Sequence, residues 1–551
     1  MKALKGLLLG SAAAVVGVSG AKAADLPARQ AAPIEYVRVC DAYGSGFFYV
    51  PGTDTCLKVG GLVLGEVRFY DASYQVNGAS FQATGTATGL GSSTAAMNPT
   101  LPASAIRGTG GASTFGYIPT GAQYTNARTR DAYGWNTLGR IELDARTGTP
   151  WGTLRSFLRV DSYVGTGFAN TGSLQSGSSF ASGLYNNTMN SAVRETTIVN
   201  KAFIQFAGLT AGRAQSMFDF YASAYNYQNL AGSNATTQLL AYTYRFGDGW
   251  SATVSIEDQA ARSTAIGSTV SGAYNAAGAL TAASLNGMAG TSFTAQPAGM
   301  RWPDIVGNIR IDQKWGSAQL SAAGHQARAS LWASGATNFN MLGAPAATDD
   351  TYGWAIQGGV QLNVDYLSPG DKLWLQAAYE QGAVSYIWGN NLASSYGAVN
   401  GLRFQGSGFT PADTSANWNP NNIADCVFTL SGACEQQTGW SVVAAYKHYW
   451  LPTLASAVYG SYAKVNYSYN ALQGYGGAVG VSNISTARVG TNLVWTPVKG
   501  FDVGAEFMYV NVATTRPAGL APDAVLNSVG LPGYRSSSNQ YEGRVRVQRA
   551  F

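Results

Sequence analysis

Polar and apolar residues alternate along many segments of this chain. In GRIELDAR at 139–146, charged residues fill the even positions and Ile, Leu and Ala lie between them. The same alternation runs through DIVGNIRIDQKW at 304–315 and QYEGRVRVQRAF at 540–551, where only Arg549 falls on the apolar parity. Because successive side chains of a strand point to opposite faces, each segment predicts a strand with one polar and one apolar face.

A soluble β-sandwich also alternates, so the connections between the strands must discriminate. Gly- or Pro-containing turns alternate with long stretches rich in Ser, Thr, Gly and Asn. The short connections are 146–152, 246–250, 314–318, 367–372, 448–453 and 495–500, with a seventh near 208–212, and the long ones are 71–130, 164–193, 259–302, 327–350, 383–435, 468–483 and 515–539. This alternation places all turns at one end and all loops at the other. It is typical of an outer-membrane β-barrel with short periplasmic turns and long extracellular loops.

The pattern predicts an all-β transmembrane antiparallel barrel of about sixteen strands. Their expected ranges are 57–70, 132–146, 151–163, 194–207, 210–214, 237–246, 250–258, 304–315, 317–327, 351–365, 372–383, 438–447, 454–467, 485–496, 500–513 and 540–551. An even strand number puts both termini on the periplasmic side, and a barrel of this size encloses water. Aromatic residues beside the short turns, including Trp151, Trp315 and Trp495, fit an interfacial girdle. Ordinary corner packing in a sandwich is the alternative.

Composition and the N-terminus indicate export. The chain has 68 Gly and 31 Tyr but only 11% charged residues. Lys2 and Lys5, an apolar stretch and Ala21-Lys22-Ala23 predict a signal peptide at 1–23; a membrane anchor is the alternative. Its removal lowers the formal net charge from +5 to +2, which gives little support for nucleic-acid binding. Beyond residues 1–23 the sequence contains no apolar run long enough for a membrane-spanning helix.

The four cysteines form two local pairs, Cys40 with Cys56 and Cys426 with Cys434. An even number of cysteines in an exported protein favours disulfides, and local pairing is the simplest of three connectivities. Metal sites need tighter clusters, so we expect neither metal nor cofactor. The residues 24–56 are expected to form a periplasmic segment that carries the first disulfide.

No catalytic constellation is evident. His325 and His448 are far apart in the sequence. Ser461 and Lys464 match S-x-x-K, but on a strand they would point to opposite faces. We therefore expect a protein that is not an enzyme.

An aromatic and polar interruption at 213–236 follows an unusually short predicted strand. We expect it to fold into the barrel and narrow it, with Asp219 offering a negative charge. Its expected constriction residues are Arg213, Phe218, Asp219, Phe220, Tyr221, Tyr225 and Tyr227. An exposed loop or a small helix is the alternative.

Early strands would present charged residues to the lumen, opposite this loop. The expected pore-wall residues are Lys58, Glu66, Arg68, Arg140, Glu142, Arg155, Arg159, Asp161 and Lys201. Rings of fixed charge set selectivity in pores, and the basic excess here suggests a mild anion preference or a transverse field. A wet wall also needs polar residues for solvation alone.

Three stretches resemble porins of alphaproteobacteria of the rhizobial group: EYVRVCDAYGSGFFYVPGTDTCLKVGG at 35–61, GLTAGRAQSMFDF at 208–220 and GRVRVQRAF at 543–551. The resemblance implies a homotrimer of sixteen-stranded barrels, each narrowed by its third loop and passing small hydrophilic solutes. It also implies that 213–236 is the constriction loop and that Cys40 and Cys56 are the family's N-terminal pair. Phe551 would belong to the signal that the barrel-assembly machinery reads.

We therefore predict a passive, water-filled channel of the bacterial outer membrane, in contact with lipid and lipopolysaccharide and formed by residues 57–551. A solute-specific channel or an adhesin that uses its long surface loops is the alternative function. An outer-membrane hydrolase would lack its catalytic residues, and a soluble β-sandwich is the structural alternative.

Overall fold

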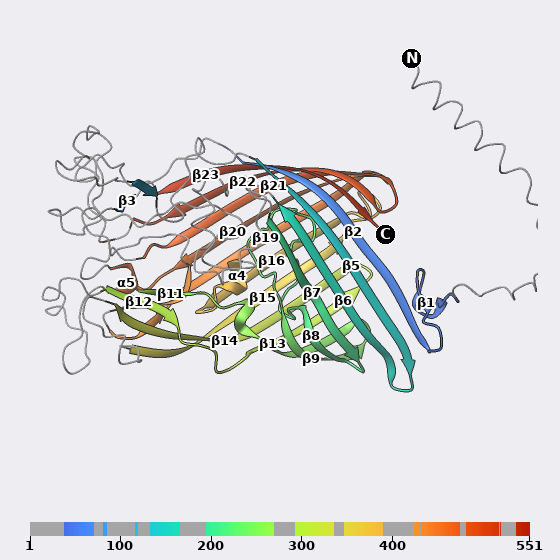
Figure 1. Ribbon diagram of the computed structural model, residues 1–551, viewed down its shortest axis with the longest axis horizontal. Coiled ribbons are helices and arrows are strands. Elements are labelled where there is room, and N and C mark those ends of the chain that lie inside the picture. Colours follow the sequence, from blue (N-terminus) through green and yellow to red (C-terminus); the bar gives the residue numbers. More distant parts are fainter. Residues whose placement is uncertain are drawn as a thin grey trace, which may run out of the picture.

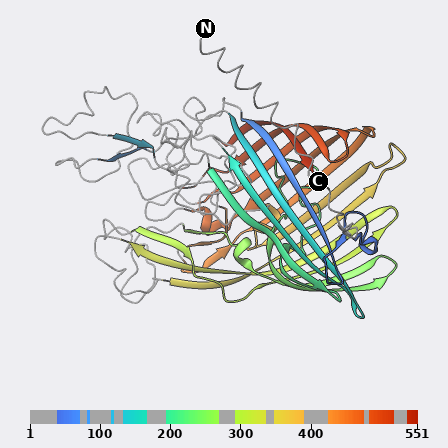
Figure 2. The same ribbon diagram turned by 45° about the vertical axis from the view of Figure 1, so that its right-hand side comes forward.

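A computed structural model describes residues 38–70, 81–84, 116–119, 133–165, 194–268, 292–334, 347–388, 423–429, 431–473, 481–516, 518 and 536–551. Sixteen of its strands form one closed antiparallel barrel (Figures 1 and 2). These strands are β2 (Thr55–Tyr70), β5 (Tyr133–Thr149), β6 (Gly152–Gly165), β7 (Arg194–Phe206), β8 (Leu209–Gln215), β9 (Thr236–Gly247), β10 (Trp250–Glu257), β13 (Asp304–Gln313), β14 (Gly316–Ser334), β15 (Ala347–Asn363), β16 (Lys372–Gln381), β19 (Thr438–Leu451), β20 (Leu454–Asn466), β21 (Ile484–Val498), β22 (Phe501–Thr514) and β23 (Ser537–Ala550).

Each barrel strand pairs with its sequence neighbours, and the last strand closes the barrel against the first. β2 pairs with β5 along one edge and with β23 along the other, from Leu62 opposite Ala550 to Tyr70 opposite Glu542. The short turns lie at one end of the barrel, where β1 (Phe48–Tyr49) and the C-terminus are also found (Figure 1). The predicted fold class is confirmed.

Some strands extend further than their sequence pattern predicts. β14 continues to Ser334 and β15 begins at Ala347, so both enter the expected loop 327–350. The reason is an additional partner: β12 (Ser292–Pro297) pairs with Ala329–Ser334 of β14. The long connections also contain elements that alternation did not predict. These are β3 (Phe81–Thr84), β4 (Gly116–Pro119), η4 (Gln259–Ala261), β11 (Ala265–Ser268), α4 (Ser385–Trp388), β17 (Ala424–Phe428), β18 (Cys434–Gln436) and α5 (Tyr469–Leu472).

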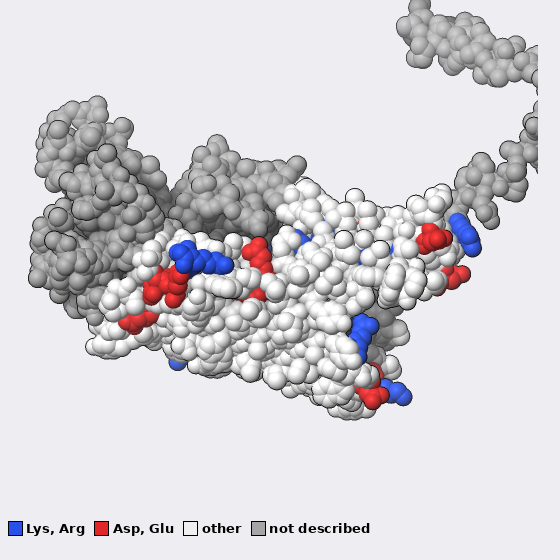
Figure 3. All heavy atoms as spheres, turned by 90° about the horizontal axis from the view of Figure 1, so that it is seen from below, with Lys and Arg blue, Asp and Glu red and all other residues white. Residues whose placement is uncertain are grey.

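The outer wall is apolar. Burial alternates along most barrel strands, and the exposed parity carries large apolar side chains. Examples from around the barrel are Val63, Ile141, Ile204, Val254, Ile305, Leu320, Ile356, Val458, Val489, Phe507 and Val545. On the face drawn in Figure 3 the middle of the wall is mostly uncharged, and charged residues gather toward its two ends. A surface of this kind suits lipid rather than water.

Aromatic residues lie beside the short turns and are exposed, as a girdle requires. They are Trp151, Phe246, Trp250, Trp315, Trp450 and Trp495. In the part of the chain that the structure describes, no helix has the length and apolarity needed to cross a membrane.

Both disulfides join the local pairs. Cys40–Cys56 connects the start of β2 to a short segment that contains η1 (Asp41–Tyr43) and β1, which pairs with β2. Cys426–Cys434 joins β17 to β18 in a small three-stranded sheet with β11. The expected signal peptide at 1–23 lies outside the described residues.

Candidate functional site: a loop inside the barrel

The segment between β8 and β9, residues 216–235, crosses the interior of the barrel, and we call it the constriction loop. Its backbone N–H groups donate to side chains from the far wall. Glu506 of β22 accepts from the N–H groups of Tyr227 and Gln228. Gln376 of β16 accepts from Tyr221 N–H (3.0 Å), and Ser461 of β20 from Ala231 N–H (3.0 Å). Inward-facing side chains of these strands therefore hold the loop in place.

The loop's carbonyl groups are satisfied from the wall as well. Gln357 of β15 donates to the Phe218 carbonyl (2.9 Å) and Asn492 of β21 to the Tyr225 carbonyl (2.7 Å). Arg544 of β23 donates to the Tyr227 carbonyl (3.2 Å). Because buried backbone groups without partners are costly, these side chains replace the sheet hydrogen bonds that an irregular segment lacks.

Aromatic side chains fill the space between loop and wall. The rings of Phe220, Tyr221 and Tyr225 lie 4.9, 5.6 and 6.5 Å from Trp374 of β16, centroid to centroid. The Trp374 indole N–H donates to the Tyr225 hydroxyl (3.0 Å). Phe218 packs edge-on against Tyr386 of α4, with centroids 4.7 Å apart.

Tyr227 lies near the closure of the barrel. The Arg546 guanidinium of β23 sits 3.9 Å from the centre of the Tyr227 ring. Burial raises the pKa of Tyr227 to about 12, so its phenol stays neutral. The five aromatic residues expected in the loop are thus all found there.

Two of the expected constriction residues differ from the expectation, Arg213 in its position and Asp219 in its environment. Arg213 belongs to β8, where its Nε donates to the Val199 carbonyl (3.1 Å), and is not part of the loop. Asp219 is only 9% exposed. Its carboxylate accepts from Gln215, Ser233 and the N–H of Ala235, so it anchors the loop rather than offering an open charge.

Arg262, just after η4, neutralises the negative charge of Asp219. Its guanidinium lies 3.3 Å from Asp219 and donates to the hydroxyls of Ser216 (2.8 Å) and Ser233 (3.0 Å). Burial alone lowers the pKa of Arg262, but Tyr386 and the surrounding carboxylates, Asp219 among them, raise it overall. The two ends of the loop are therefore held together by a charged arginine from the connection after β10.

The wall on β5 and β6 carries paired charges with an excess of arginine. Asp161 accepts from Arg140 (2.8 Å) and Arg159 (2.7 Å). Glu142 lies within 4.0 Å of the same two arginines. Closer to the short turns, Asp144 lies between Arg146 (2.8 Å) and Arg155 (2.9 Å). Four arginines thus face three carboxylates on β5 and β6, which leaves this part of the wall with one positive charge in excess.

The other expected wall residues lie on β2 and β7. Glu66 is buried and bonded to Arg68 and Arg546, with Arg544 3.6 Å away. Lys201 of β7 pairs in register with Arg159 of β6. Lys58 is exposed, 5.9 Å from the Phe47 ring. Arg544 and Arg546 complete this wall; the alternation of the last strand had placed both on its polar face.

A buried polar network joins β13 and β14 to the connections after β10 and β16. The sequence did not predict it. His325 of β14 is 2.8 Å from Asp304 and 3.6 Å from Asp425. Asp304 also accepts from the Tyr386 hydroxyl (2.7 Å), and Asp425 from Thr264. These residues come from five segments separated by up to 161 positions, so no local pattern identifies them. The network fixes the connections after β10 and β16 to one another.

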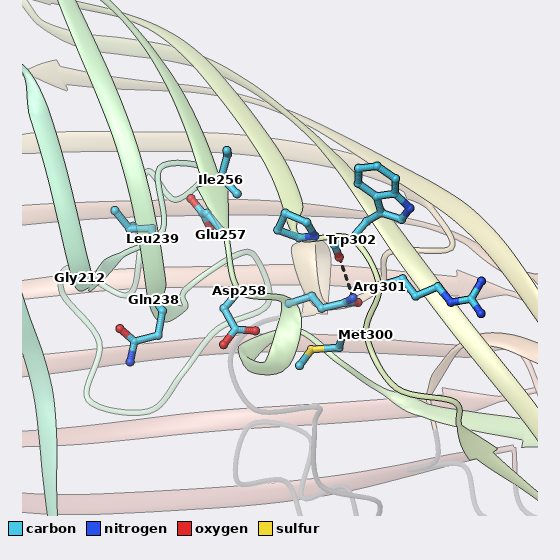
Figure 4. A pocket seen from close by; sticks show the side chains of 11 residues that line it. Gly212, Gln238, Leu239, Ile256, Glu257, Asp258, Met300, Arg301 and Trp302 are labelled. Atoms are coloured by element: carbon cyan, nitrogen blue, oxygen red, sulfur yellow. Dashed lines mark hydrogen bonds between the residues drawn. The ribbon is translucent and has the colours of Figure 1, made fainter.

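A pocket of about 500 Å³ lies beside the end of β10 and the start of β13 (Figure 4). It is lined by exposed Ile256 of β10 and by Met300 and Trp302. Gln259 donates to the Trp302 carbonyl (2.9 Å) across it. The lining also includes buried Leu239 of β9 and Glu257 of β10, so the pocket combines residues from both faces of these strands.

The comparison with known families now decides what the barrel is. A sequence profile of the family described as porin subfamily matches residues 25–100 and 106–530. The chain belongs to this porin family. Porin Omp2b of Brucella canis is 26% identical over 411 residues, which are 73% of this chain and 81% of that protein. Porin Omp2b of Brucella neotomae is 29% identical over 321 residues, 57% of this chain and 64% of that protein.

Among solved structures, the outer membrane channel DcaP of Acinetobacter baumannii has a TM-score of 0.48 at 14% identity, over 91% of this chain and 99% of that one. The anion-selective porin of Comamonas acidovorans has a TM-score of 0.39 at 10% identity, over 90% and 100%. The expected resemblance to alphaproteobacterial porins is confirmed by the family match and the Brucella relatives. This porin is a passive channel of the outer membrane.

Proposed function

We propose that this porin lets small hydrophilic solutes and ions diffuse through water, and that the constriction loop sets their size limit. The observation that carries the proposal is the fixation of residues 216–235 to the inner face of β15–β23. Backbone groups of Tyr221, Tyr227 and Ala231 bond to three different wall strands. A loop held along its length can narrow a sixteen-stranded lumen without closing it.

The electrostatic part of the proposal rests on the unequal sides of this passage. The loop's one carboxylate, Asp219, is buried beside Arg262. The β5–β7 wall holds Arg140, Arg159 and Lys201 around Asp161 and Glu142. Fixed charge of this sign favours anions over cations of equal size.

Single-channel recording tests the size limit. Replacing residues 221–230 by a short Gly-Ser linker removes the rings of Tyr221, Tyr225 and Tyr227 and should raise the conductance about twofold or more. Large sugars should then enter liposomes that contain the variant faster than those with the parent. A folded variant with parental conductance would show that the loop does not limit passage.

A matched control uses a surface segment of similar polarity. Ser431→Ala, in the exposed turn between β17 and β18 and away from the lumen-crossing loop, should leave conductance unchanged. Saturable uptake of one solute by the parent would instead favour a solute-specific channel. Folded barrels without any current would favour an adhesin.

Export and assembly belong to the same proposal. Residues 1–23 would be cleaved on export, and 24–56 would form the periplasmic segment fixed by Cys40–Cys56. We further propose a homotrimer embedded in lipid and lipopolysaccharide. Phe551 would be read by the barrel-assembly machinery; it is exposed, and its backbone pairs with Gly61 at 3.1 Å in both directions.

A further inference from the structure

A second pocket lies inside the barrel, on the short-turn side of the constriction loop. It has a volume of about 460 Å³, and Met217 and Asp219 of the loop line it together with β7–β10, β13 and β14. We infer that this pocket binds small organic anions that carry hydroxyl groups, such as sugar phosphates or hydroxy acids. It would act as a solute subsite below the constriction.

Three cations line the pocket at neighbouring positions. Arg245 of β9 pairs in register with Ser251 of β10, which pairs with Arg310 of β13. The two arginines therefore lie at the same height on the wall, with β10 between them. Adjacent β-strands are about 4.8 Å apart, so the backbones of β9 and β13 are roughly 10 Å apart, and the long arginine side chains can both reach a phosphate or carboxylate placed between them. Lys201 lines the same pocket from β7.

Most of this positive charge is uncompensated. Arg310 forms a bidentate pair with Asp312 (2.8 and 2.9 Å). Within the described residues, neither Arg245 nor Lys201 has a carboxylate within ion-pairing distance. Asp219 reaches the pocket, but its oxygens are engaged with Ser233, the Ala235 N–H and Arg262, as described above. The pocket thus has two cations free for a ligand.

The remaining lining suits a hydroxylated ligand rather than a bare inorganic ion. Thr210, Thr243, Ser251, Thr253 and Asn308 supply hydroxyl and amide groups around the cations. Phe203, which stacks on Phe157 with centroids 5.2 Å apart, adds an apolar surface. A few convergent polar groups beside an apolar surface are typical of small-molecule sites.

The position of the subsite predicts asymmetric access. Arg245 lies two residues before Gly247, in the turn that ends β9, and Asp312 lies just before the β13–β14 turn. A solute from the short-turn side reaches the pocket directly, whereas one from the loop side must first pass the constriction. This inference rests on the proposed channel function.

The test uses the full-length porin in planar bilayers with glucose 6-phosphate as probe and glucose as the uncharged comparison. Glucose 6-phosphate added on the short-turn side should interrupt the KCl current at a concentration several-fold lower than on the loop side. Glucose should require a far higher concentration. In the double variant Lys201→Gln, Arg245→Gln the half-blocking concentration should rise about tenfold, because two charge-assisted contacts are lost.

Matched variants separate local contacts from total charge. Lys314→Gln removes one charge from the exposed β13–β14 turn, outside the pocket, and should leave the block unchanged. Arg245→Lys keeps a cation and should retain most of the block. Open channels in which the double variant is blocked like the parent would overturn the subsite.

Calorimetric titration of folded, detergent-solubilised porin with glucose 6-phosphate gives a readout independent of current. Binding that the double variant loses supports the subsite even if no channels open, a result that would instead refute the proposed function. Absence of heat from binding in the parent, together with unblocked channels, would refute the subsite and leave the channel function standing.

Discussion

Arg262 shows how a single residue outside the barrel strands controls the constriction. Its side chain is buried with Asp219, and it joins the hydroxyls of Ser216 and Ser233, which lie at opposite ends of the loop. Ser216 also donates to Glu257 (2.6 Å). The Arg262 guanidinium is therefore linked to two carboxylates, to Asp219 directly and to Glu257 through Ser216. Removing one partner of a buried pair leaves an uncompensated charge, which costs far more than the pair itself contributes.

We expect Arg262→Met to destabilise the folded arrangement of the two loop ends by about 3–5 kcal/mol, because Asp219 loses its cation while remaining buried. Single channels should then show frequent conductance fluctuations, and the folded band on gels should convert to the unfolded form at a lower temperature. Arg301→Met is the control, since the Arg301–Asp350 pair (3.5 Å) is exposed and should contribute about 0–1 kcal/mol. Equal behaviour of the two variants would show that Arg262 does not hold the loop.

At the scale of elements, the turn before β16 is fastened to β19 by one carboxylate. Asp371 accepts from the Tyr446 hydroxyl (2.7 Å), from His448 Nδ1 (2.7 Å) and from Tyr449 N–H (2.9 Å). Burial alone raises the pKa of Asp371, but the hydrogen bonds from His448, Tyr446 and Tyr449 lower it overall. The charged form is therefore favoured by folding.

A carboxyl whose folded pKa is lowered stabilises the fold above its unfolded pKa, about 3.9, and this contribution is lost as the pH falls through the folded value. Asp371→Asn should lower the unfolding temperature at pH 7, and the difference from the parent should shrink below about pH 4. Heat-modifiable gel migration across this pH range measures it. A difference that persists unchanged at pH 2 would mean that the charge of Asp371 is not what holds the turn.

The sequence predicts the barrel strands well because their signal is local. Alternation and turn residues identify strands such as β5 and β22 without knowledge of their partners. β17 lacks this signal, since it is buried on both faces and pairs with β11 about 160 residues away. Arg262 lies 43 residues from Asp219, and Asp304 lies 21 residues from His325. Asp219, which the sequence suggests is an open charge, is therefore neutralised by a residue outside its own loop. Long-range polar pairing is what local periodicity cannot reveal.

At the scale of the whole molecule, the barrel closes where β2 meets β23, and the end of the chain lies against a glycine there. A Cβ built on Gly61 would lie 2.5 Å from the Arg140 carbonyl oxygen and 2.5 Å from the Phe551 ring. Since the Arg140 oxygen is backbone in β5, it cannot move aside without disturbing the sheet. Gly65, four residues further along β2, is exposed and has no atom within 4 Å of the same position.

Gly61→Val should therefore impair closure, whereas Gly65→Val on the same strand should be tolerated, because it adds an apolar group to the lipid-facing surface. Refolding into detergent followed by unheated gel electrophoresis measures the folded fraction, and protease resistance of the barrel gives a second readout. We expect a several-fold lower folded yield for Gly61→Val and a yield near that of the parent for Gly65→Val. Equal yields would mean that β2 can shift against β23, and that the contact between Gly61 and Phe551 does not fix the register in which the barrel closes.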